Sequence, residues 1–250
     1  MTTHGAASSR IGILFALPEE AAPFQRFLLR NPDLQKRVSV AVSGVGVKNS
    51  ETAAKKLLEI PGKPFRLLIV CGFGGGLSPD VKPGSLMTAN RVEYFGSYPL
   101  FQKSFQIEET LRDRLFRRFA FPDSQPRFEF CDFATTDHIL ISQSEKQSFF
   151  DQHSCPVVEM ETAGAVSVAE EKGIPWIATR VITDAATEDL PLDFNALSDE
   201  NGNPDRSKII RAVLRKPTAI PGLVRLGGRS SVGAKQLSEF LVILCQTFSA

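Results

Sequence analysis

Two apolar runs that end in carboxylates constrain the fold of this chain more than any other feature of its sequence. The first run leads through Val157 and Val158 into Glu159-Met160-Glu161, where a helical pattern begins at once. The second run, Trp176–Thr183, ends at Asp184. Apolar strands that alternate with helices are typical of an α/β fold, and sites in such folds form at the carboxyl ends of strands. The two runs therefore predict a polar reaction centre at one edge of a sheet.

Other strand-like runs alternate with helical patterns along the chain and favour the same α/β class, with at least partly parallel strands. The expected strands are Ile11–Leu17, Val38–Val42, Leu67–Cys71 and Leu86–Ala89, and the clearest expected helices are Lys48–Ile60 and Glu161–Lys172. Gly173 and Pro175 follow the second helix and form a stop signal.

Two glycine clusters come directly after expected strands. They are Ser43-Gly44-Val45-Gly46 and Gly72-Phe73-Gly74-Gly75-Gly76, and we expect both to be loops. The second matches neither the P-loop nor the dinucleotide fingerprint, since Pro79 follows where a helix would start. Phosphate binding, close approach to a flat ligand and a simple tight turn all stay open for it.

Length and composition predict a soluble globular protein. The 250 residues, 42% of them hydrophobic, suffice for one large domain or two small ones. We expect a disordered segment over residues 1–10 and a single domain over 11–250, with a basic extension from about residue 190. Four widely spaced cysteines and three histidines show no metal-ligand spacing, so neither a metal nor a disulfide is expected. Ile11–Leu17 is too short to cross a bilayer, and we expect a cytoplasmic protein.

The net charge of +1 conceals an uneven distribution. Residues 206–235 carry eight basic and no acidic residues, which leaves 21 basic against 28 acidic residues, or −7, for the rest. Apolar residues interleave with the basic ones, a pattern that suits contact with an anionic membrane. A solvated helix pair packed on the domain is the simpler alternative. The segment has no aromatic residues to stack on bases, so nucleic acid is not an expected partner.

Three acids at expected strand ends are the candidate chemical groups. Taken singly, Glu20 and Glu161 are ordinary first-turn helix acids, and Asp184 is a turn or capping residue. Taken together they offer a different chemistry, because carboxylates alone can activate water, protonate a leaving group and hold hydroxyls. No Ser–His or Cys–His arrangement competes with them as a nucleophile.

Five motifs in order resemble the nucleoside phosphorylase/nucleosidase superfamily, and specifically its hydrolases of 5′-methylthioadenosine and S-adenosylhomocysteine. The motifs are Ile11–Glu20, Ser43–Gly46, Gly72–Leu77, Val158–Glu161 and Arg180–Asp184. The resemblance covers roughly residues 11–190. It implies a three-layer α/β/α fold with a central mixed sheet, a purine nucleoside substrate, no cofactor and a homodimer.

The same resemblance implies a role for each acid. Glu20 would activate the attacking water, Glu161 would bind the ribose hydroxyls beside Met160, and Asp184 would protonate purine N7. An oxocarbenium-like sugar needs nearby negative charge and a departing base needs a proton, so these roles are chemically consistent. The remaining expected substrate-binding residues are Glu159, Phe73, Gly74, Ile139, Leu140, Ser43 and Gly44.

Two departures from the nucleosidase pattern bear on the substrate. Phe73 stands where a serine is common, and Ile139 stands where an aromatic ring usually stacks on the base. Both departures, with Lys146 and the C-terminal extension, resemble a hopanoid-associated branch that removes adenine from adenosylhopane. The 5′ substituent therefore stays open between a small thio-group and a bulky apolar chain.

The acids near Pro18 also bear on the type of reaction. Glu19 and Glu20 lie where phosphorylases of the superfamily place an arginine, so hydrolysis is favoured over phosphorolysis. A purine nucleoside phosphorylase and a non-catalytic nucleoside-binding or membrane-associated module are the alternatives.

Overall fold

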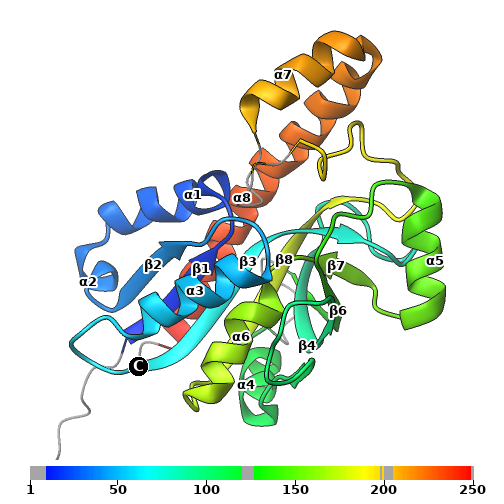
Figure 1. Ribbon diagram of the computed structural model, residues 1–250. Helices are drawn as coiled ribbons and strands as arrows, with labels where there is room; N and C mark the ends of the chain where they lie inside the picture. The colour runs from blue at the N-terminus through cyan, green and yellow to red at the C-terminus, as the bar shows by residue number, and fades with distance from the viewer. Residues whose placement is uncertain (1–9, 120–126, 198, 200–204, 249–250) are drawn as a thin grey trace, which may run out of the picture.

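The computed structural model describes residues 10–119, 127–197, 199 and 205–248 (Figure 1). These residues form one mixed sheet of eight strands with helices packed on it. The strands are β1 (Arg10–Phe15), β2 (Val38–Val42), β3 (Phe65–Gly76), β4 (Leu86–Phe95), β5 (Ser104–Gln106), β6 (Glu129–Thr136), β7 (Val157–Glu159) and β8 (Trp176–Asp184). The expected α/β class with a central mixed sheet is confirmed.

Helices cover both faces of the sheet. They are α1 (Pro18–Leu29), α2 (Pro32–Gln35), α3 (Val47–Leu58), α4 (Glu109–Phe119), α5 (Gln143–His153), α6 (Thr162–Glu171), α7 (Arg206–Arg215) and α8 (Ile220–Phe248), with a short 3₁₀ turn at Pro217–Ala219. Helix α3 packs on α6, and α1 packs on α8 (Figure 1). Side chains alternate along β8, so that Val181 meets α8 while Arg180 bonds to Thr162 of α6. The α6 and α8 layers therefore lie on opposite faces of this strand.

Strand β3 connects the two halves of the sheet. Most of it runs parallel to β1 and β8, and its last two residues, Gly75 and Gly76, pair antiparallel with β7. Pairing continues from β7 to β6, from β6 to β4 and from β4 to β8. Strands β3, β8, β4, β6 and β7 thus close a circuit, which brings the ends of β3, β7 and β8 together.

The glycines of β3 correct one prediction. The expected loop over Gly72–Gly76 is strand, because its backbone pairs with β8 and, at its end, with β7. Neighbouring segments occupy the space that side chains at these glycines would need. A Cβ on Gly74 would lie 3.2 Å from the Val158 oxygen, and one on Gly76 would lie 3.1 Å from the Val81 oxygen. The other cluster is a loop as expected, and Gly44 and Gly46 have φ of 82° and 101°. Such positive φ values favour glycine.

Several boundaries agree with the sequence analysis. Strand β2 spans the predicted residues, α1 begins at Pro18, and Gly173 follows α6 with φ 62°. Residues 1–9 lie outside the described residues, and Arg10 already belongs to β1. Strands β5 and β6 and helices α4 and α5 were not predicted.

Helix α8 has two different halves. Its second half is buried and packs on α1, β3 and β8, whereas its first half projects from the body of the molecule beside α7 (Figure 1). Among the described helices, none combines the length and apolar character needed to cross a bilayer.

Candidate active site

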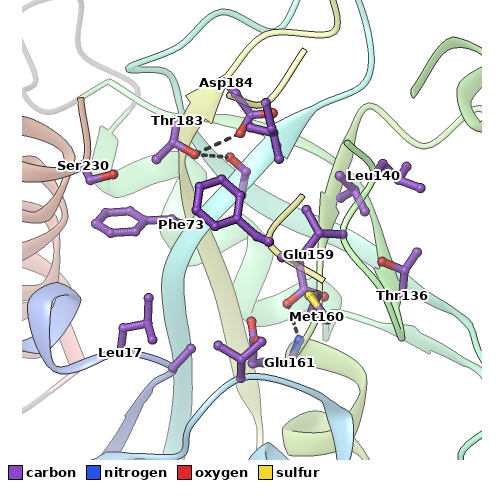
Figure 2. Close-up of a pocket in the computed structure, with 18 of the residues that line it drawn as sticks. Leu17, Phe73, Thr136, Leu140, Glu159, Met160, Glu161, Thr183, Asp184 and Ser230 are labelled. Carbon is purple, nitrogen blue, oxygen red and sulfur yellow. Dashed lines mark hydrogen bonds between the residues drawn. The ribbon is translucent and has the colours of Figure 1, made fainter. Parts of the chain in front are cut away.

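A cavity of about 290 Å³ lies where the ends of β3, β7 and β8 meet the start of α1 (Figure 2). Glu20, Glu159, Glu161 and Asp184 all line it. These carboxylates come from α1, β7, the start of α6 and β8, so the fold collects at one point the acids that the sequence separates. A largely apolar cavity with a few convergent polar groups is the usual form of a small-molecule site.

Glu20 is fixed by backbone hydrogen bonds at the first turn of α1. One carboxylate oxygen accepts hydrogen bonds from the amides of Ala16 and Leu17, at 3.0 and 2.9 Å. The other accepts one from the amide of Phe73, at 2.8 Å. Burial raises the pKa of Glu20, while these three hydrogen bonds and the nearby Arg180 oppose the rise. A carboxylate whose pKa is moved toward neutrality is suited to accept a proton.

Gly72 provides the space that Glu20 occupies. A Cβ at this position would lie 2.7 Å from one carboxylate oxygen of Glu20 and 2.9 Å from its carboxyl carbon. The position of the Glu20 carboxylate therefore requires a glycine at residue 72.

Arg180 lies in the interior of β8 and pairs with the two glutamates that flank Met160. Its guanidinium donates a hydrogen bond of 2.5 Å to Glu159 and lies 3.8 Å from a carboxylate oxygen of Glu161. Glu159 also accepts hydrogen bonds from Thr135, the Glu161 amide and both the amide and hydroxyl of Thr162. Both oxygens of Glu159 are thus occupied by the protein itself.

The carboxylate of Glu161 accepts fewer hydrogen bonds from the protein than that of Glu159. One oxygen accepts a 2.9 Å hydrogen bond from the Gly46 amide, and the other faces Arg180 at the longer distance already given. Burial, reinforced by the negative charge of Glu159, raises the pKa of Glu161 to about 8. This carboxyl can therefore still bind hydroxyl groups of a ligand.

Asp184 ends β8 and pairs with a buried lysine of α5. The Lys146 ammonium lies 2.6 Å from one Asp184 oxygen, and the Thr183 hydroxyl donates to the other at 3.0 Å. Lys146 also donates to the backbone oxygens of Ala185 and Glu188, at 3.0 and 2.8 Å. An ammonium has three protons, so Lys146 is fully used in holding the turn after β8.

The rest of the cavity wall is mainly apolar. Phe73 and Met160 lie between the acids, as Figure 2 shows, and further apolar side chains complete the wall. These are Leu17, Val45, Ile139, Leu140, Val158, Leu190, Phe194 and Leu226. The cavity therefore combines acids at its centre with an apolar surround.

Nine of the eleven residues predicted for the site line this cavity. They are Glu20, Phe73, Gly74, Ile139, Leu140, Glu159, Met160, Glu161 and Asp184. Ser43 and Gly44 are not among the lining residues, and their neighbour Val45 is. The Ser43 hydroxyl bonds to the backbone oxygens of Gly44 and Phe15, at 2.6 and 3.2 Å. Ligand binding by these two residues stays a prediction.

The sequence analysis missed two kinds of site residue. Arg180 was not assigned a role, although an arginine inside an apolar strand needs buried acidic partners. The lining residues Leu190, Phe194, Leu226 and Ser230 come from the C-terminal part, where only a basic extension was predicted. No local motif marks them, because chain folding alone brings this segment to the cavity.

The family model of the phosphorylase superfamily matches residues 10–215, which is most of the chain. The protein belongs to this superfamily.

Particular relatives refine the comparison. The 5′-methylthioadenosine/S-adenosylhomocysteine nucleosidase of Mycobacterium bovis is 24% identical, over 74% of this chain and 89% of that protein. The enzyme of the same name from Listeria innocua is 24% identical, over 64% of this chain and 74% of that protein.

Solved structures share the fold at lower identity. Futalosine hydrolase of Helicobacter pylori matches with a TM-score of 0.71 at 17% identity, over 97% of this chain and 99% of that one. The 5′-methylthioadenosine/S-adenosylhomocysteine nucleosidase of H. pylori matches with a TM-score of 0.68 at 16% identity, over 95% and 98%.

Proposed function

We propose that this protein is a nucleosidase that hydrolyses the N-ribosidic bond of a 5′-substituted adenine nucleoside and releases adenine. The observation that carries the proposal is the presence of Glu20, Glu161 and Asp184 on the wall of one cavity. The names of the relatives support it, since they are nucleosidases and a futalosine hydrolase.

Each acid has one task in the proposed reaction. Asp184 protonates N7 of the purine, and the bond between C1′ and N9 breaks with its electron pair leaving on the base. Glu20 takes a proton from water as the water oxygen bonds to C1′. Glu161 binds the ribose hydroxyls, and its ionised form, which gains population as the pH rises toward its pKa of about 8, stabilises the oxocarbenium-like sugar.

Hydrolysis fits the charge of the cavity better than phosphorolysis. Four carboxyl groups line it, and two nearby buried cations, Arg180 and Lys146, are engaged by Glu159 and Asp184. A phosphate dianion would meet like charges there. A purine nucleoside phosphorylase is the alternative, and it predicts ribose 1-phosphate formed only when phosphate is present.

The apolar surround supports a substrate with a bulky apolar 5′ group. Phe73 and Ile139 replace more polar or aromatic residues, and Leu190, Phe194 and Leu226 extend the apolar wall. A methylthio group, a homocysteinyl group and an adenosylhopane-like chain are the candidates. Adenine nucleosides of increasing 5′ apolar bulk should show rising kcat/KM, because each buried methylene adds binding energy. A constant or falling kcat/KM would favour the small thio-substrates.

The experiment for the proposed reaction is adenine release by the purified protein from a panel of adenine nucleosides, followed by chromatography. Asp184→Asn should lower kcat by about 10²–10⁴-fold, the usual value of a general acid. Asp113→Asn is the matched control, since Asp113 is exposed on α4 and is not among the lining residues. If no base is released from any nucleoside, the protein is a non-catalytic module. If D184N retains near-full activity, Asp184 is not the acid.

The homodimer and the cytoplasmic location stay predictions. A membrane contact through residues 206–235 also stays a prediction.

A further inference from the structure

Helix α7 and the first two turns of α8 form a projection that we call the α7–α8 arm, residues 206–228. The arm stands out from the body of the molecule (Figure 1). None of the described side chains of α7 is buried. Ile210 is 62% exposed, Leu214 is 75% exposed and Val224 is 70% exposed. Large apolar side chains this exposed, gathered on one projection, mark an interaction surface.

The arm is also strongly basic. Residues 206–228 carry six basic residues and no acidic residue. Arg211, Arg215 and Lys216 are exposed at the end of α7, whereas Arg225 and Arg229 of α8 face Glu188 near the cavity. Cationic groups therefore lie beside the exposed apolar side chains of the arm.

The arm begins at the mouth of the cavity. Leu226 and Ser230 of α8 line the cavity wall, and Val224 and Ile220 lie on the same helix farther out along the arm. Ile220 is also exposed, at 46%. Val224 lies about 200° around the helix from Leu226, so the base of the arm borders the cavity while the exposed apolar side chains of the arm face away from it.

We propose that the α7–α8 arm docks on an anionic phospholipid bilayer. Leu214 and Val224 enter the boundary between headgroups and acyl chains, and Arg211 and Arg215 contact lipid phosphates. A helix of this kind lies in the membrane interface with its apolar side chains buried there and its basic groups at the anionic surface. Docking would hold the cavity, whose wall includes Leu226 of the arm, close to the lipid surface, where on the proposed function a nucleoside with an apolar 5′ chain is found.

The charge of the arm is what favours a bilayer over another partner. Apolar contact alone would serve a protein as well, but the exposed cations Arg211, Arg215 and Lys216 match a surface of uniform negative charge. A second copy of this chain is the competing occupant, because its remaining residues carry a net charge of −7. The experiment includes a separate measurement that tests for such a dimer.

Co-sedimentation with vesicles tests the proposal. The wild-type protein is mixed with vesicles of phosphatidylcholine alone, or with roughly one third phosphatidylglycerol, in buffer of about 0.01 M ionic strength, where screening is weak. Binding to the anionic vesicles should exceed binding to the neutral ones and should fall in about 1 M salt, where the Debye length is only about 3 Å.

Three double variants identify the surface. R211E/R215E and L214S/V224S should each lower the partition onto anionic vesicles by about tenfold or more, given about 1 kcal/mol for each basic residue and similar values for buried apolar groups. R117E/R118E makes the same charge change at exposed residues of α4, and it should bind like the wild type. Circular dichroism and the thermal midpoint show that each variant is folded, without reliance on the proposed reaction.

Several outcomes would overturn the proposal. They are absence of binding at low salt, equal binding to neutral vesicles, and equal loss in R117E/R118E. Sedimentation equilibrium without lipid is the remaining measurement: a dimer of the wild type that R211E/R215E and L214S/V224S dissociate would make the arm an interface between two copies. If the wild-type protein binds anionic vesicles but releases no adenine, only the proposed function is refuted.

Discussion

Glu159 and Glu161 lie two residues apart, yet the fold gives their carboxylates different surroundings. Glu159 is fully bonded by Arg180, Thr135 and Thr162, and it fixes the turn between β7 and α6. Glu161 has one backbone partner, Gly46, and a raised pKa of about 8. Burial, reinforced by the charge of Glu159, raises this pKa, so the protonation of Glu161 depends on pH near neutrality.

The free energy of unfolding should depend on whether Glu161 is protonated. The unfolded chain loses the Glu161 proton near its ordinary pKa of 4.5, but the folded chain retains it up to about 8. The stabilising effect is fully present below pH 4.5 and is lost as the pH rises to 8. Urea unfolding from pH 5 to 9 should show a steeper fall in the free energy of unfolding for the wild type than for E161Q. Parallel curves would show that Glu161 has an ordinary pKa in the folded protein.

Gly72 gives a second prediction at the level of single residues. Gly72→Ala places a methyl group 2.7 Å from a Glu20 oxygen, so Glu20 must leave its three backbone partners. We expect kcat for adenine release to fall by roughly 10²-fold, as displacements of about 1 Å in a site can cause.

Gly228→Ala is the control for this substitution. A Cβ on Gly228 meets nothing within 4 Å, and its helix should gain about 0.5–1 kcal/mol of stability with activity unchanged. Equal kcat values for G72A and the wild type would show that Glu20 is not positioned by this contact.

At the scale of elements, the sequence analysis succeeded where a local pattern decides the structure. The apolar runs of β2, β7 and β8 and the stop at Gly173 follow from hydrophobic periodicity and glycine geometry. The continuation of β3 through Gly72–Gly76 could not be predicted, because its glycines make room for Val158 and Val81, which are distant in sequence. Most acids of the site were found from their place at strand ends, whereas Phe194 and Leu226 reach the cavity only through the path of the whole chain.

Helix α5 contributes to the site through one residue. Lys146→Met should remove the partner of Asp184 and leave the backbone oxygens of Ala185 and Glu188 without their donor. Breaking a buried ion pair costs about 3–5 kcal/mol, so the midpoint of urea unfolding should fall substantially. We also expect kcat to fall more than KM rises, because Asp184 acts in the chemical step. A change in KM alone would place Lys146 in substrate binding.

At the scale of the whole molecule, stability is unevenly distributed. The residues of β8 are all buried and the strand pairs with both β3 and β4, whereas α7 buries none of its described side chains. Regions with few buried contacts open locally at little cost in free energy. The molecule therefore joins a rigid strand circuit to a helical arm that is weakly held.

Amide hydrogen exchange should show this difference. Amides of α7 should exchange roughly three or more orders of magnitude faster than those of β8, which open only on global unfolding. Mass spectrometry of peptides from the two segments measures both rates in one sample. Comparable protection in α7 and β8 would mean that the arm is held by contacts that its exposure does not indicate.

The buried ion pair between Arg180 and Glu159 has an evolutionary consequence. Replacing either residue alone leaves an unpaired charge in the interior, at a cost of about 3–5 kcal/mol. Such a step removes a large part of a total stability of about 5–15 kcal/mol. Selection in lineages that descend from this chain should therefore favour retaining both residues or exchanging them in concert. Glu161 also lies within ion-pair distance of Arg180, so its replacement should be limited in the same way.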